Sequence, residues 1–280
     1  MQYLDNFSYK ETLSTNPNEK RLSEGGLRLS GKFKKERPTF SIITVVLNGE
    51  KYLEETILSV LKQNFLNFEY IIIDGGSIDN SINIIKKYEN KIDYWVSETD
   101  KGLYDAFNKG ISLAKGEFIG IINSDDTYTP DALGIVKKYI LENKNIDFIF
   151  GSVKKHWGIL HGYKPKKIRY SWGFYSSHST GFFIKRESAK KVGLYNTRYK
   201  YHSDYDYFYR MIVKNKMKGM ATKKDELLGI FRRGGFSSTI SFWDSFLEEI
   251  KIRYDNKQNI LIIVVIFIYK FVRNIDKAFK

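Results

Sequence analysis

Hydrophobic residues in the first half of the chain gather in short continuous runs, separated by segments with helical periodicity. The runs Phe40–Leu47, Phe68–Asp74 and Glu117–Ile122 are rich in β-branched side chains, which is typical of strands buried on both faces. Between the runs, apolar residues recur every three or four positions, as at Leu53 and Ile57. That spacing predicts amphipathic helices.

This alternation continues from residue 40 to about residue 150, with short connections. It predicts further strands at residues 92–97 and 147–150, and helices at residues 50–64, 77–88, 103–114 and 130–142. Alternating strands and helices indicate an α/β fold with a mostly parallel sheet and helices on both faces. In such folds, ligands bind at the carboxyl ends of the strands.

The two ends of the chain have different patterns. Residues 1–38 show little periodicity and contain turn signals, so we expect a loosely ordered N-terminal extension. Residues 39–240 form the expected main domain, with a late helix at residues 203–215. Residues 241–280 form the expected helical tail, with a helix at residues 242–254 before the apolar run Ile260–Tyr269.

Composition narrows the function classes. The 280 residues include 46 Lys and Arg, 32 Asp and Glu, and no Cys, which gives a net charge of +14. Without cysteine, a disulfide scaffold, a Cys-ligated metal site and a cysteine nucleophile are excluded. The positive charge favours an anionic partner such as nucleic acid, an acidic membrane surface or a phosphorylated ligand. The chain opens without a secretory signal pattern, so we expect a cytoplasmic protein.

Three groups of acidic residues stand out because they lie at the end of a predicted strand or at the start of a predicted helix. An Asp at a strand end often only caps the next helix, and the same applies to an Asp at a helix start. Two adjacent carboxylates repel each other unless donors or a cation neutralise them, and such oxygen ligands suit Mg²⁺ or Mn²⁺ bound jointly with phosphates. The residues are Asp74 at a strand end, Asp125 and Asp126 after the next long strand, and Asp204 and Asp206 at the start of the late helix.

Together these sites resemble a family 2 glycosyltransferase of the GT-A fold, as found among bacterial O-antigen, capsule and exopolysaccharide enzymes. The resemblance covers roughly residues 39–240 and implies a Rossmann-like, mostly parallel sheet with helices on both faces. The segments that carry it are SIITVVLNGEKYLEETILSVLKQ, YIIIDGGSIDNS, SETDKGLYDAFNKGISLAKGEFIGIINSDD, HSDYDYFYRM and FRRGGFSS.

The resemblance implies a role for each matching position on the donor side. Asp74 would bind the nucleotide base, and Asp100 would line the nucleotide site. The segment Asn123-Ser124-Asp125 stands for the D-x-D motif, with Asn123 and Ser124 on the donor and Asp125 binding Mn²⁺ or Mg²⁺. Asn123 replaces the first Asp of that motif.

Further roles follow for the second part of the chain. Asp204 would be the general base, with Asp206 as the next candidate, and Ser203 stands where relatives have Glu. We expect Arg233 and Ser237 to contact the diphosphate, and His178 to contact the acceptor.

The implied activity is inverting, metal-dependent transfer of a hexosyl or N-acetylhexosaminyl group from a nucleotide-sugar, most simply a UDP-sugar. The acceptor would be a hydroxyl of a glycan or an undecaprenyl-diphosphate-linked glycan in bacterial surface polysaccharide synthesis, and no nucleic-acid partner is expected. A sugar-phosphate nucleotidyltransferase is an alternative, although that class usually carries a basic, Gly-rich loop where this chain has Leu47-Asn-Gly-Glu-Lys. A nucleic-acid-binding protein is another, given the basic and aromatic stretch Lys154–Trp172.

The apolar run at residues 260–269 has two interpretations. As a helix it would span roughly 15 Å, which is too short for the roughly 30 Å hydrocarbon core of a bilayer. Cations follow it, so peripheral attachment to the anionic inner face of a bacterial membrane is one interpretation. A helix packed on the domain is the other.

Overall fold

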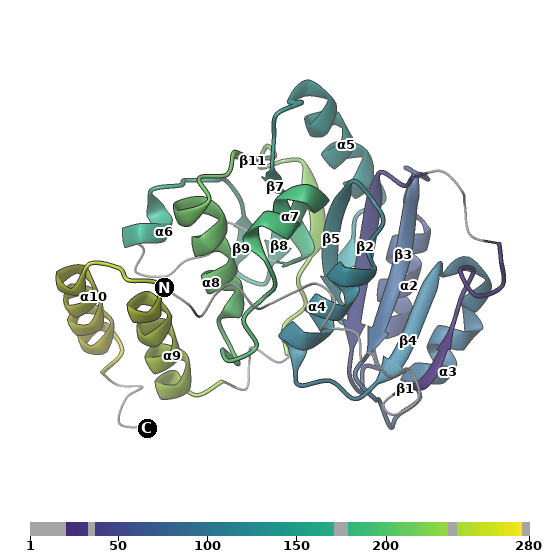
Figure 1. The fold of residues 1–280 in the computed structure, drawn as a ribbon, viewed down its shortest axis with the longest axis horizontal. Coiled ribbons are helices and arrows are strands. Elements are labelled where there is room, and N and C mark those ends of the chain that lie inside the picture. Colours follow the sequence, from purple (N-terminus) through teal and green to yellow (C-terminus); the bar gives the residue numbers. More distant parts are fainter. Residues whose placement is uncertain (1–20, 33–36, 171–178, 235–239, 276–280) are drawn as a thin grey trace.

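A central sheet forms the body of the protein (Figure 1). The computed structural model describes residues 21–32, 37–170, 179–234 and 240–275. The strands lie in the order β1-β4-β3-β2-β5-β10-β7-β11. Strands β4, β3, β2 and β5 are parallel, whereas β10 is antiparallel to both of its neighbours. The bounds are β1 Arg21–Gly25, β2 Phe40–Val46, β3 Phe68–Asp74, β4 Tyr94–Glu98, β5 Phe118–Asn123, β7 Phe148–Phe150, β10 Phe182–Lys185 and β11 Gly219–Ala221.

A second, smaller sheet has the order β6-β12-β8-β9. Strand β6 begins four residues after Asn123, the last residue of β5, so this sheet continues from the carboxyl edge of the main sheet. The bounds are β6 Thr127–Tyr128, β8 Ser152–Lys155, β9 Gly158–Leu160 and β12 Leu227–Ile230.

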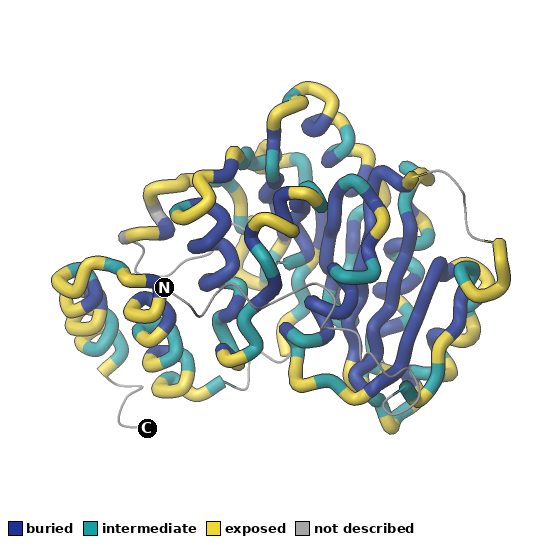
Figure 2. Tube along the Cα trace, viewed as in Figure 1, coloured by how far each residue is buried: buried dark blue, intermediate teal, exposed yellow. Residues whose placement is uncertain are grey.

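Helices cover both faces of the main sheet, which confirms the predicted α/β class. On one face, Ile43 of β2 packs in the same cluster as Phe107 of α4. On the other, Ile42 of β2 packs with Leu53 of α2 and Leu133 of α5. All seven residues of β2 are buried (Figure 2), as the continuous apolar run predicted. The helices are α2 Leu53–Leu61, α3 Ser81–Lys87, α4 Leu103–Leu113, α5 Ala132–Glu142, α6 Lys167–Tyr170, α7 Arg186–Val192, α8 Ser203–Tyr209, α9 Phe242–Asp255 and α10 Ile260–Arg273; a π-helical turn, Arg210–Lys214, extends α8.

Residues 21–32 belong to the folded body, so the expectation of a loosely ordered extension is wrong for this stretch. Strand β1 pairs antiparallel with β4. Beyond it, Arg28 donates to Glu69 at 2.7 Å. The sequence RLSEG lacks an apolar run because an edge strand with one exposed side needs none.

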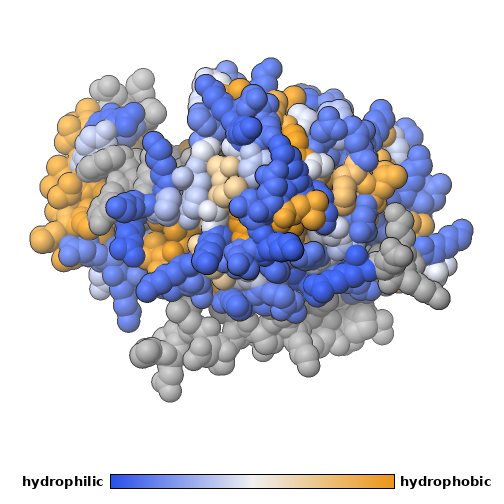
Figure 3. All heavy atoms as spheres, turned by 90° about the horizontal axis from the view of Figure 1, so that it is seen from above, coloured by the Kyte–Doolittle hydropathy of each residue, from blue (hydrophilic) through white to orange (hydrophobic). Residues whose placement is uncertain are grey.

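The C-terminal helices α9 and α10 lie side by side at one end of the molecule (Figure 1). Ile263 and Ile266 of α10 are buried, and Phe267 packs on Phe246 of α9 with ring centroids 5.0 Å apart. The opposite side of α10 is exposed, with Leu261 at 72%. Figure 3 shows hydrophobic side chains gathered at this end of the molecule. In the described part of the chain, no helix combines the length and hydrophobicity that a membrane span requires.

Candidate active site

The residues proposed for the donor lie at one edge of the main sheet. In the strand register, Asp74 at the end of β3 pairs with Val46 of β2, and Asn123 at the end of β5 pairs with Val45. These two residues are therefore two strands apart, or about 10 Å at roughly 4.8 Å per strand. This is the carboxyl edge, where α/β folds bind ligands.

Asp74 is fully buried, and its two carboxylate oxygens have different surroundings. Oδ2 accepts hydrogen bonds from the Ser97 hydroxyl at 2.6 Å and from the amides of Gly76 and Ser77, each at 3.0 Å. Oδ1 is buried and has no donor among the described residues. Leaving a buried acceptor unpaired is costly, so this atom is suited to an N–H group of a ligand.

Two loops next to Asp74 are tied to each other. Asn48, at a φ of 51°, follows β2; its amide donates to the Ser77 hydroxyl at 2.7 Å, and its side-chain oxygen accepts from the Ile78 amide at 2.9 Å. The Glu50 amide donates to Asp79 at 3.0 Å. These contacts hold the turns after β2 and β3 in one fixed arrangement beside the Asp74 carboxylate.

Asp100 lies against the turn that follows β3. A Cβ atom at Gly75 would lie 2.3 Å from the Asp100 carboxylate, so any larger residue here would force the Asp100 side chain to move. The Gly102 amide donates to Asp100 at 2.9 Å. Burial raises the pKa of Asp100, the Gly102 amide opposes this rise, and the nearby negative charge of Asp74 adds to it. Asp74 and Asp100 therefore lie within electrostatic range of each other.

Asn123 and Asp125 are both partly buried at the end of β5. The Asn123 side-chain amide donates to Ser179 at 3.2 Å, whereas its oxygen is buried and finds no donor in the part of the chain that the structure describes. Burial raises the pKa of Asp125, and its own amide and the charge of Arg232 oppose this rise. A cation beside Asp125 would favour its ionised form.

Asp126, by contrast, is held in place by hydrogen bonds from other parts of the chain. It is fully buried, and its carboxylate accepts from the Thr180 hydroxyl at 2.6 Å and the Arg232 amide at 3.1 Å. Burial, reinforced by the charge of Asp125, raises the pKa of Asp126 to about 7. The side chain thus joins β5 to the segment after β12.

Arg232, the neighbour of the predicted diphosphate contact Arg233, contacts the D-x-D segment. Its guanidinium donates to the Asp125 carbonyl at 3.2 Å and to Glu55 at 2.5 Å, and it lies 4.0 Å from the centre of the Tyr52 ring. Arg233 is exposed. Two adjacent arginines look equivalent in sequence, and only the direction of the chain after β12 separates them.

Asp204 lies in the first turn of α8 and is partly buried. Its Oδ1 accepts from the Tyr205 amide at 2.8 Å and, more weakly, from the Tyr104 hydroxyl at 3.4 Å. Burial raises the pKa of Asp204, while a charge on His202 and these two donors oppose the rise. A carboxylate with a raised pKa is a stronger base than an ordinary Asp.

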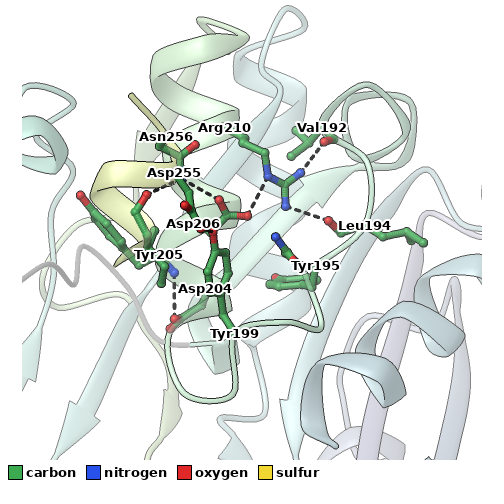
Figure 4. A network of polar contacts seen from close by, with 12 residues as sticks. Val192, Leu194, Tyr195, Tyr199, Asp204, Tyr205, Asp206, Arg210, Asp255 and Asn256 are labelled. Carbon is green, nitrogen blue, oxygen red and sulfur yellow. Dashed lines mark hydrogen bonds and ion pairs between the residues drawn. The ribbon is translucent and has the colours of Figure 1, made fainter. Parts of the chain in front are cut away.

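Asp206, unlike Asp204, has a carboxylate that is bound by two other side chains. It is 4% exposed, and it accepts from Arg210 at 2.9 Å and from Asn256 at 2.8 Å (Figure 4). Arg210 also donates to the carbonyls of Val192 and Leu194. Asp206 therefore anchors α8 to its neighbours.

Lys155 of β8 connects the two acidic regions electrostatically. Burial lowers its pKa, and the negative charges of Asp126 and Asp204 both oppose this. Its ammonium group lies 4.3 Å from the centre of the Phe231 ring. In the sequence, this lysine stands out only as one member of a basic stretch. Its electrostatic interaction with two carboxylates that are far from it along the chain produces no local sequence pattern.

Two predicted site residues, His178 and Ser237, lie outside the described residues. Over residues 21–32, 37–170, 179–234 and 240–275, no three acidic or histidine side chains cluster as a metal site.

Comparison with known proteins identifies the family of this chain. Residues 41–212 match the glycosyl transferase family 2, and the chain belongs to that family. A PGL/p-HBAD biosynthesis glycosyltransferase of Mycobacterium bovis is 28% identical over 217 residues, covering 72% of this chain and 80% of the relative. An uncharacterised glycosyltransferase of Methanocaldococcus jannaschii, MJ1057, is 29% identical over 194 residues, covering 64% of this chain and 67% of the relative.

Solved structures share the fold at low identity. S. aureus TarS 1-349 in complex with UDP-GlcNAc aligns with a TM-score of 0.62 and 18% identity, over 85% of this chain and 73% of that one. The mannosyltransferase PcManGT of Pyrobaculum calidifontis, in complex with GDP-Man and Mn²⁺, aligns with a TM-score of 0.59 and 14% identity, over 94% and 74%. The chain spans 43% of a longer TarS structure.

Proposed function

We propose that this protein transfers a hexosyl or N-acetylhexosaminyl group from a UDP-sugar to a glycan hydroxyl, with inversion at the anomeric carbon. The observation that carries the donor assignment is the buried Oδ1 atom of Asp74, which has no donor among the described residues. The imide N–H of uracil would supply the missing hydrogen bond. The complex of TarS with UDP-GlcNAc supports this choice of nucleotide.

Asp204 is the proposed general base. The acceptor oxygen forms a bond to the anomeric carbon, the bond from that carbon to the diphosphate oxygen breaks, and the electron pair leaves with the diphosphate. Asp204 takes the hydroxyl proton as the new bond forms. The raised pKa of Asp204 suits this role.

A divalent ion, Mn²⁺ or Mg²⁺, fits the residues at the end of β5. Asp125 would hold it with one carboxylate, and the donor phosphates would complete the coordination. When bound, such an ion neutralises negative charge that develops on the departing diphosphate. The complex of PcManGT with GDP-Man and Mn²⁺ supports this proposal.

Membership of the glycosyl transferase family favours this activity over a nucleotidyltransferase or a nucleic-acid-binding protein. We place the acceptor among lipid-linked glycans, such as an undecaprenyl-diphosphate-linked glycan of a bacterial surface polysaccharide. That choice rests on the tail, where the exposed apolar side of α10 suits the interface of an anionic inner membrane. Leu261, Val265 and Ile268 are each more than half exposed, and the chain carries a net charge of +14.

Donor binding is tested by thermal shift with UDP, GDP and dTDP, each with and without Mn²⁺, followed by transfer assays with a panel of sugar nucleotides. We expect stabilisation by UDP that increases with Mn²⁺. Stabilisation by RNA alone would contradict the transferase assignment.

Membrane attachment is tested by flotation with anionic liposomes. The double variant Val265→Asp, Ile268→Asp changes only exposed positions of α10 and should float less than the wild type. Equal flotation of the two proteins would refute attachment through α10.

A further inference from the structure

We propose that Glu248 of α9 is a positioning residue that holds the segment leading into Asp204. The proposal rests on the proposed function of Asp204 as the general base. The Glu248 carboxylate accepts three successive backbone hydrogen bonds, from the amides of Lys200 at 2.5 Å, Tyr201 at 2.7 Å and His202 at 2.8 Å. Hydrogen bonds from backbone amides to an ionised carboxylate are short and strong.

The start of α8 depends on this support from outside. His202 stands at the N-cap of α8, and its side chain makes no capping hydrogen bond. Instead, its ring nitrogen lies 2.8 Å from the hydroxyl of Ser245, three residues before Glu248 on α9. Asp204 is two residues past this anchored point, so its carboxylate is placed by the backbone that Glu248 binds.

The end of α9 secures the other side of Asp204. Tyr199 donates to Asp255 at 2.7 Å and Asn256 donates to Asp206 at 2.8 Å (Figure 4). Gln258 donates to the Tyr205 hydroxyl at 2.9 Å. Contacts from α9 and the turn after it therefore reach both sides of Asp204 along the chain.

The contacts of Glu248 are separate from the donor edge of the sheet. The three amides belong to residues 200–202, whereas Asp74 and Asn123 belong to β3 and β5. A change at Glu248 should consequently reduce turnover without weakening the binding of nucleotide.

The matched test compares Glu248→Gln with Asp244→Asn. Both changes replace a carboxylate with an amide on α9, and Asp244 is exposed. In Glu248→Gln, an NH₂ group replaces one acceptor oxygen and faces backbone N–H donors. Since a misplacement of about 1 Å at a reacting group can cost about 100-fold in rate, we expect kcat to fall about 10–100-fold. The Kd for UDP with Mn²⁺ should stay within about twofold of the wild type. The control should match the wild type in both quantities.

Hydrogen–deuterium exchange provides a readout that is independent of activity. Amides 200–202 should exchange faster in Glu248→Gln than in Asp244→Asn. If Glu248→Gln proves unfolded, Ser245→Ala decides in its place, because it removes only the His202 contact and should lower kcat in the same direction by a smaller factor. Unchanged exchange, or equal kcat for the tested variant and the control, overturns the proposal.

The two proposals fail in different ways. Loss of the base assignment appears as normal turnover in Asp204→Asn, whatever Glu248 does. Loss of the positioning role appears as an inactive Asp204→Asn together with a fully active Glu248→Gln.

Discussion

The end of β5 and the start of α8 each carry two acidic residues, and in both regions the two neighbours have opposite surroundings. Asp126 is fully buried and bound by Thr180 and the Arg232 amide, whereas Asp125 next to it is partly exposed. Asp206 is buried against Arg210 and Asn256, whereas Asp204 accepts only one short hydrogen bond among those described, from the Tyr205 amide.

The comparison separates carboxylates that are bound by other residues of the chain from carboxylates that are more exposed, which are the ones we propose for metal binding and catalysis. In each region the buried acid ties its segment to a distant part of the chain. The two acids of each region therefore differ in their surroundings, and the variants below test whether they also differ in function.

The largest expected effect is on turnover at Asp204. Asp204→Asn keeps the size of the side chain and removes its basicity, so kcat should fall about 10²–10⁴-fold. The Kd for UDP with Mn²⁺, measured by calorimetry, should remain near that of the wild type. Turnover within a few-fold of the wild type would move the base elsewhere.

Asp206→Ala should act on stability. Removing one partner of a buried ion pair typically costs about 3–5 kcal/mol, because it leaves the other charge uncompensated. Urea unfolding should show this loss for Asp206→Ala and a much smaller one for Asp204→Asn. Equal losses in the two variants would erase the distinction between them.

Asp125→Ala should abolish the part of UDP affinity that depends on Mn²⁺. Because even the outer-shell partners of metal ligands contribute about 10–100-fold to affinity, a direct ligand should contribute at least as much. The measurement is UDP titration with and without Mn²⁺. Wild-type Mn²⁺ dependence in this variant would contradict the assignment of Asp125.

The smallest effect is expected at Asp126, as a dependence of stability on pH. Its folded-state pKa of about 7 exceeds the usual value of 3.8, so between these values the folded protein binds more protons than the unfolded chain. Stability from this group therefore falls as pH rises from about 4 to about 7. The difference in Tm between Asp126→Asn and the metal-free wild type should shift in favour of the variant over this range. A difference that does not change with pH would contradict the raised pKa.

Sequence patterns predicted the parallel half of the fold well. Strands buried on both faces are continuous apolar runs, so β2 and β3 were located to within one residue at each end. The helices between them were also expected, because one apolar stripe per helix is a strong signal. Short strands such as β8 and β12 were missed, since four residues are too few to show a clear periodicity.

Contacts between distant segments could not be predicted from the sequence. The three amides bound by Glu248 lie 46 to 48 residues before it. The bond between Asp126 and the Arg232 amide spans 106 residues. Local pattern locates candidate acids at strand ends and helix starts, but only tertiary packing decides which acid is buried.

Strand β1 has a practical consequence for anyone who shortens this protein to the family match at residues 41–212. Residues 21–25 pair with β4, and β4 carries Ser97, which binds Asp74. A chain that starts near residue 40 would expose a row of unpaired N–H and C=O groups along β4. Such open edges recruit strands from other molecules, so the shortened protein should self-associate and precipitate at concentrations where the longer chain stays dispersed.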